Sequence, residues 1–223
     1  RSEELIFCYR CGTRYIAQAI QCPECHEPNV LIRLTEKHVA VCGVMGSAGA
    51  AHPPAVQEKC FLLGQEIVRR NIVLATGQCL GLPHRAVEGA KALHGFVVGF
   101  SPAMNQEEHD YRYGSPTDGY DLTVFCGDGF MGREVTCIRS CDMVVFVSGQ
   151  TGTLGELAIA LEEGKIVGAL LGTGGVADYV QHIYQDICGS KQTGAVVLAA
   201  NEPGKLLDMM LRSHQLRTSA GRG

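Results

Sequence analysis

The sequence has no apolar run that approaches the roughly 18 residues a membrane-spanning helix needs. It also has no excess of basic residues, because 19 Lys and Arg stand against 23 Asp and Glu and the net charge is −4. A protein that neutralises many backbone phosphates is normally basic, so this balance disfavours nucleic acid as a partner. The first residues lack the basic-then-apolar pattern of a secretory signal. We therefore expect neither a membrane nor a nucleic-acid partner.

The length of 223 residues suggests one domain with an appendage, or two small domains. Apolar residues make up 46% of the chain, which is enough to bury a full core. Glycine is frequent, with 28 residues, and favours tight loops of the kind that hold phosphate groups. Seven of the 11 cysteines stand singly, mostly in apolar stretches: Cys42, Cys60, Cys79, Cys126, Cys137, Cys141 and Cys188. An oxidised secreted protein seldom carries so many unpaired thiols, so the pattern predicts a cytoplasmic protein with these cysteines in its core.

The other four cysteines form two C-x-x-C pairs within residues 1–35, namely Cys8, Cys11, Cys22 and Cys25. Two such turns can present four thiolates in a tetrahedron, so the spacing predicts a small zinc ribbon with a structural zinc ion. Redox pairs, or cysteines that only pack, are the alternatives, but so short a segment has little core of its own. Four Arg balance four Glu in this segment, which favours a structural or protein-contact role over nucleic-acid binding.

From residue 36 to residue 223, short apolar strands alternate with helices. Strands are expected at residues 38–42, 71–75, 95–100, 121–126, 142–147, 165–171 and 195–199, and helices at 56–70, 83–94, 132–140, 153–163, 176–188 and 203–212. A polar loop is expected between the third and fourth strands, at 101–120, and a frayed end at 218–223. This alternation is typical of a parallel sheet covered on both faces. The sequence therefore predicts an α/β, Rossmann-like doubly wound sheet, which binds ligands beyond the carboxyl ends of its strands.

Two glycine-rich segments follow strands and give weak signals. Residues 43–49 include Gly46 and Ser47, whose small side chains allow either a nucleotide to approach the backbone or a tight turn. Residues 127–132 match G-x-G-x-x-G, but they follow a late strand, and the acid nearest the expected spacing lies inside a predicted helix. A dinucleotide fingerprint belongs on the first strand of its unit, so this match is weak.

A third segment, residues 148–156, leads from a strand into a helix. Its backbone N–H groups would face an anion at the start of that helix. Thr153 can cap the helix, and Glu156 then takes the last position of a capping box. The alternatives are a well-capped helix and a phosphate loop with a carboxylate beside the bound group. The candidate binding residues of this loop are Gly149, Gln150, Thr151, Gly152 and Thr153.

Residues 148–156 read S-G-Q-T-G-T-L-G-E and resemble the P-G-G-x-G-T-x-x-E motif of the LOG ("lonely guy") family. This family belongs to the SLOG group of Rossmann-like nucleotide-binding proteins. Its arginine, fifteen residues before the motif, corresponds to Arg133, and residues 76–82 resemble its second glycine loop with Gly77 and Gly81. Residues 101–109 and 172–178 look most like an uncharacterised branch related to DprA-type proteins.

The resemblance implies hydrolysis of nucleoside 5′-monophosphates to free base and ribose 5-phosphate, with Arg133 and Glu156 as catalytic residues. It also implies a homodimer and no organic cofactor. A protein partner, if there is one, is expected to bind through the zinc ribbon. Ser148 and Gln150 replace the family's proline and second glycine, a departure that bears on catalysis more than on binding. The alternative is a protein that binds or carries a nucleotide, or a phosphorylated pterin such as molybdenum cofactor, without turnover.

Overall fold

The computed structural model describes residues 5–8, 10–11, 13–16, 19, 21–27, 39–49, 51–188, 191 and 193–220. Contacts divide the chain into two compact units, Arg1–Val39 and Ala40–Gly223. In the first unit, β1 (Leu5–Phe7) pairs antiparallel with β2 (Arg14–Ile16). Tyr15 of β2 packs with the cysteines that follow the two strands and forms the small core of this unit.

The second unit is built on a sheet of seven strands, all parallel, in the order β6-β5-β4-β3-β7-β8-β9. The strands are β3 (Val41–Gly46), β4 (Val73–Thr76), β5 (Val97–Ser101), β6 (Leu122–Phe125), β7 (Met143–Val147), β8 (Ile166–Leu170) and β9 (Val196–Ala200). The central strands are apolar on both sides, as burial on two faces requires. The Rossmann-like α/β fold predicted from the sequence is confirmed.

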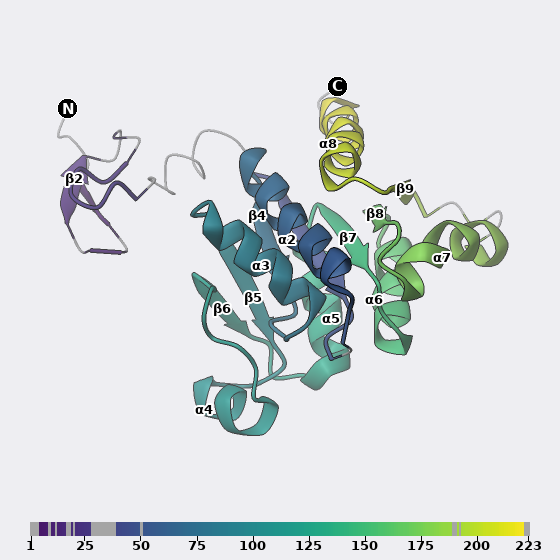
Figure 1. Ribbon diagram of the computed structural model, residues 1–223, viewed down its shortest axis with the longest axis horizontal. Coiled ribbons are helices and arrows are strands. Elements are labelled where there is room, and N and C mark those ends of the chain that lie inside the picture. Colours follow the sequence, from purple (N-terminus) through teal and green to yellow (C-terminus); the bar gives the residue numbers. More distant parts are fainter. Residues whose placement is uncertain are drawn as a thin grey trace. The chain divides into compact units, whose positions relative to one another are not determined.

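Helices cover both faces of this sheet (Figure 1). One face carries α2 (Pro54–Arg69), α3 (Leu82–Ala92) and α8 (Pro203–Ala220), and the other carries α5 (Gly129–Arg139), α6 (Thr151–Glu162) and α7 (Gly175–Ile183). Neighbouring residues of β7 face opposite cores, because successive side chains of a strand alternate: Val145 packs with the first set of helices and Phe146 with the second. Among the described residues, no helix is long and apolar enough to cross a membrane.

The structure differs from the sequence prediction at several boundaries. The first strand of the sheet extends to Gly46 rather than ending at residue 42, and residue 38 lies outside the described residues. The expected loop at 101–120 contains a short helix, α4 (Gln106–Glu108), and a π-helical turn, His109–Tyr113. A second π-helical turn, Tyr184–Cys188, follows α7, and α8 continues to Ala220 instead of ending at residue 212.

Candidate functional site

The main cavity lies where the strand order of the sheet reverses. β3 pairs with β4 on one side and with β7 on the other, so the helices that follow β3 and β7 lie on opposite faces and leave a crevice at the carboxyl ends. A cavity of about 520 Å³ opens there. Its lining residues are Gly46, Ser47, Ala48, Gly49, Cys79, Arg133, Glu134, Gln150, Thr151, Gly152, Thr153 and Glu156.

One wall of the cavity is the start of α6. Ser148 and Gly149 turn the chain with φ of 53° and 104°, and the helix begins at Thr151. Gln150 is the residue before the helix, and its side chain makes no hydrogen bond to the first backbone N–H groups of α6. The predicted capping box is wrong, because Thr153 already lies inside the helix and Glu156 lies beyond its first turn. An uncapped helix start beside a cavity suits an anion.

The loop between β8 and α7 holds this turn in place. The backbone N–H of Ser148 donates to Thr173 Oγ1 over 2.8 Å, and the carbonyl of Gly149 accepts from the N–H of Val176 over 3.0 Å. Gly175 approaches so closely that a Cβ there would overlap the Gly149 carbonyl. The loop after β8, about 25 residues further along the chain, therefore fixes the orientation of the N–H groups at the start of α6.

Arg133, on α5, is the single arginine among the lining residues and is only 5% exposed. Its Nη1 donates to the carbonyl of Gly77, while its Nε is buried with no hydrogen-bond partner in the described parts of the chain. A buried N–H donor that makes no hydrogen bond costs free energy, so this guanidinium favours a ligand that brings an acceptor into the cavity. Arg133 thus offers a positive group to a bound anion.

Glu156, on α6, is 7% exposed and shares the cavity with Arg133. Burial raises the pKa of Glu156 to about 8, an effect that Arg133 opposes and the nearby Glu134 reinforces. The carboxyl is therefore mostly protonated at neutral pH. In that form it can donate a hydrogen bond or a proton, but it cannot offer a full negative charge.

Glu134 and Cys79 also line the cavity, and sequence reasoning missed both. Glu134 is 5% exposed, and burial raises its pKa against the opposing effect of Arg133. Burial raises the pKa of the Cys79 thiol as well. Glu134 directly follows Arg133, and this position next to a predicted site residue is the one sequence signal for it. Adjacent helix residues point about 100° apart, so only a structure shows that both side chains reach one cavity.

Three glycines predicted to bind the ligand are not among the lining residues. A Cβ at Gly77 would overlap the Arg133 guanidinium, and a Cβ at Gly81, where φ is 87°, would overlap the backbone of Ser47 and Ala48. A Cβ at Gly149 would overlap the side chain of Thr153. These glycines permit close packing behind the cavity wall. The G-x-G-x-x-G segment at 127–132 follows the edge strand β6 and contributes no lining residue.

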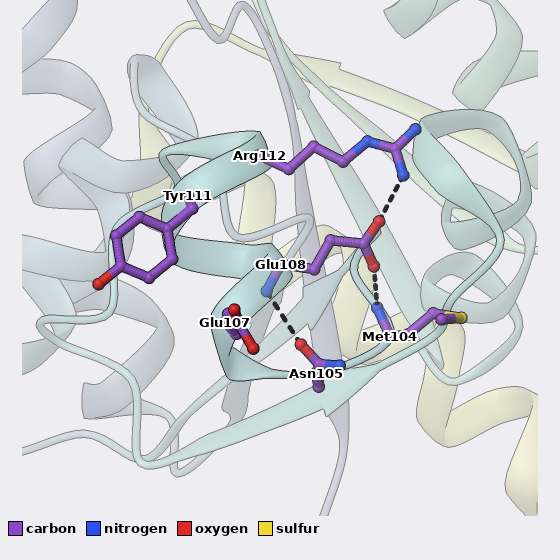
Figure 2. Close-up of a pocket in the computed structure, with 6 residues that line it drawn as sticks. All are labelled: Met104, Asn105, Glu107, Glu108, Tyr111 and Arg112. Carbon is purple, nitrogen blue, oxygen red and sulfur yellow. Dashed lines mark hydrogen bonds and ion pairs between the residues drawn. The ribbon is translucent and has the colours of Figure 1, made fainter.

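A second cavity, of about 400 Å³, lies beside the α4 turn (Figure 2). Figure 2 shows the Glu108 carboxylate between Met104 and Arg112, where it accepts the Met104 N–H over 2.7 Å and pairs with the arginine. Asn105 in turn accepts the N–H of Glu108 over 2.9 Å. Because these polar groups bond within the turn, the second cavity is a weaker ligand site than the first.

The four paired cysteines of the first unit come together. The Sγ atoms of Cys8, Cys11, Cys22 and Cys25 all lie within 4.8 Å of one another, with 3.5 Å between Cys8 and Cys25 and 3.6 Å between Cys11 and Cys22. Zn–S bonds of about 2.3 Å in a tetrahedron place sulfurs about 3.8 Å apart. The four thiols therefore fit a metal such as zinc.

Solved structures share the fold of the second unit. The TM1055 structural-genomics target is similar at 21% identity and a TM-score of 0.68, over 78% of this chain and 99% of that one. The molybdenum cofactor binding protein of Rippkaea orientalis is 26% identical with a TM-score of 0.62, over 78% and 96%. The molybdenum cofactor carrier protein of Chlamydomonas reinhardtii is 26% identical with a TM-score of 0.61, over 78% and 99%.

A model of the SLOG cluster4 family matches residues 39–207, which include every residue that lines the main cavity. Membership of the SLOG group, expected from the glycine loops, is confirmed, whereas the LOG branch within the group stays a prediction. Because the match spans most of the chain, the protein belongs to the SLOG cluster4 family.

Proposed function

We propose that the second unit binds a phosphorylated small molecule of the nucleotide or pterin class in the main cavity and holds it without turnover. The observation that carries this proposal is Arg133, a buried guanidinium with an unused Nε donor beside the uncapped start of α6. Both features favour a phosphate group. A cavity of about 520 Å³ is within the range of small-molecule sites.

The protonation state of Glu156 supports binding over hydrolysis. Breaking an N-glycosidic bond builds positive charge on the sugar, which a carboxylate can stabilise. Burial keeps Glu156 protonated near neutral pH, and a phosphate dianion nearby would raise its pKa further. Two proteins that share the fold at 26% identity are described as binding or carrying molybdenum cofactor, which also favours binding.

Phosphoribohydrolase activity of the LOG type is the second candidate. One observation favours it: a buried carboxyl with a pKa of about 8 can act as a general acid that protonates the departing base. In this reaction Arg133 would hold the phosphate, Glu156 would give its proton to the departing base, and a water molecule would add to the ribose carbon that the base leaves. The two candidates share the ligand and differ in whether it is consumed.

The test incubates the full chain with a panel of nucleoside 5′-monophosphates and a phosphorylated pterin. Calorimetry measures binding, and chromatography measures released base. We expect saturable binding, no released base, a loss of about tenfold or more in affinity for Arg133→Ala, and a change of only a few-fold for Glu156→Gln. Base release that Glu156→Gln abolishes would establish the hydrolase instead. The absence of any binding would overturn both candidates.

We also propose that the four clustered cysteines hold one structural zinc ion. Their spacing in the sequence and the separations of their sulfur atoms support this assignment. The ion would supply the stability that a unit with so small a core lacks. Metal analysis of the purified chain should find one zinc per molecule, and Cys22→Ser should lower that content toward zero.

A further inference from the structure

Glu134 is a buried acid in the cavity wall whose role the proposed function leaves open. It is 5% exposed, and its Oε2 is buried without a hydrogen-bond partner among the described residues. The guanidinium beside it in sequence, Arg133, donates to the Gly77 carbonyl. A buried oxygen that gains no hydrogen bond costs free energy, so the site favours a ligand that brings N–H donors to this carboxyl.

The position of Glu134 suits the far end of a ligand whose phosphate lies at the start of α6. A Cβ on Gly155 would stand 3.7 Å from Glu134 Oε2, so the carboxyl lies alongside that residue of α6. Gly155 comes four residues after Thr151, which is about 6 Å along the helix axis. A phosphate bound beyond the first N–H groups is therefore separated from Glu134 by a distance that a ribose or a short linker can span.

The chemistry of the carboxylate selects among heterocycles. A carboxylate only accepts hydrogen bonds, and its two oxygens match two adjacent N–H donors. Guanine and pterin share such an edge, a ring N–H next to an exocyclic amino group. Adenine and cytosine place an acceptor nitrogen next to their amino group, which leaves one carboxylate oxygen facing a lone pair. Hypoxanthine keeps the ring N–H and lacks the amino group.

We propose that Glu134 is a specificity-determining residue that reads the paired N–H edge common to guanine and pterin. The inference rests on the proposed function, because it assumes that the phosphate of the ligand lies at Arg133 and α6. It narrows the ligand class from phosphorylated heterocycles in general to those with a 2-amino-4-oxo pyrimidine ring.

Calorimetry on the full chain with four probes tests this inference: GMP, IMP, AMP and 6-hydroxymethylpterin phosphate. We expect GMP to bind about tenfold or more tightly than IMP, which lacks one donor, and AMP to bind more weakly still. The pterin phosphate has the same N–H edge as guanine, so we expect its Kd to be comparable to or below that of GMP. An AMP affinity equal to that of GMP would overturn the inference.

Glu134→Gln sharpens the test because a glutamine amide offers one acceptor and one donor. That pair matches the amino group and ring nitrogen of adenine, so we expect this variant to reverse the order and bind AMP more tightly than GMP. Glu162→Gln is the matched control: it removes the same charge from an exposed residue that pairs with Lys191 outside the cavity, and it should leave all affinities unchanged.

The outcomes separate this inference from the proposed function. If none of the probes binds to the wild-type chain, the proposed function fails and the inference fails with it. If the probes bind but their order is the same in the wild type and in Glu134→Gln, the phosphate site stands and the role of Glu134 is disproved. Thermal unfolding of both variants shows whether each is folded when its affinity is measured.

Discussion

Burial, more than the nearby positive charge, sets the protonation state of Glu156. Arg133 lowers the pKa of this carboxyl, but the loss of water contact outweighs that effect and the pKa reaches about 8. Part of the reason lies in the partners of Arg133, whose Nη1 donates to the Gly77 carbonyl rather than to a carboxylate. The site is thus less negative than two glutamates and one arginine suggest, which suits an anionic ligand.

The protonated state of Glu156 predicts a pH-dependent stability. The folded carboxyl keeps its proton up to about pH 8, whereas the unfolded chain releases it near the ordinary value of 4.5. Between these values the folded state binds more protons, so its stability falls as pH rises. Relative to Glu156→Gln, we expect the free energy of unfolding of the wild type to fall by about 1.4 kcal/mol per pH unit. Urea unfolding in steps across this window measures it, and a difference that stays constant with pH would contradict it.

Residues with a recognisable spacing were predictable, and residues defined only by packing were not. Arg133 and Glu156 could be chosen because a motif links them across 23 residues of sequence, and the structure places both in one cavity. Glu134 belongs to no motif, and its place in the cavity depends on the orientation of α5 relative to α6. Gly77 matched a binding loop, but its lack of a side chain makes room for Arg133. Sequence patterns do not distinguish these two uses of glycine.

At the scale of helices, α2 and α3 pack closely because each has a glycine at their contact. A Cβ at Gly64 would overlap the carbonyl of Ala86, and a Cβ at Gly89 would overlap the carbonyl of Phe61. Both glycines are buried inside helices, where alanine is normally the better residue. Close approach of the two backbones therefore explains why glycine stands there.

This packing predicts opposite effects for two similar substitutions. Alanine in place of glycine inside a helix usually stabilises a protein by about 1 kcal/mol. Gly64→Ala should instead destabilise by about 1–3 kcal/mol, because the added methyl group forces α2 away from α3. Gly155→Ala in α6 is the control, since its Cβ would meet nothing closer than 3.7 Å and the usual gain should appear. Denaturant unfolding compares the two, and a stabilised Gly64→Ala would refute the packing argument.

Strand and helix periodicity predicted the order of the elements in the second unit, while local turns set boundaries that periodicity does not reveal. The sequence predicts that this helix starts at residue 153, whereas α6 starts at Thr151, because the loop after β8 holds the turn at Ser148 and Gly149. The π-helical turn His109–Tyr113 was missed because its side chains show no helical stripe. His109 is buried there and hydrogen-bonds to Ser101 over 2.8 Å, a tertiary contact that the sequence does not signal.

At the scale of the whole molecule, the two units have separate cores. Among the described residues, the core of the first unit consists of Cys8, Tyr15 and Cys22 with two partly buried neighbours, and both cores of the second unit consist of residues from Ala40 onward. The described residues that line the main cavity, and those whose hydrogen bonds hold its wall, belong to the second unit. We therefore expect a metal at the four cysteines to stabilise the first unit, whereas the sheet and its covering helices stabilise the second.

Removing the metal should consequently affect the first unit alone. A chelator should extract one zinc per chain and expose four additional thiols to a thiol reagent, because a structural zinc site supplies about 10 kcal/mol or more to the fold of so small a unit. The main thermal transition and the affinity for a nucleotide should stay unchanged, since the described residues that line the cavity belong to the second unit. Cys22→Ser should reproduce the effect of the chelator without any added reagent. A fall in nucleotide affinity on chelation, in the chelated wild type and in Cys22→Ser alike, would show instead that the ribbon supports the binding site.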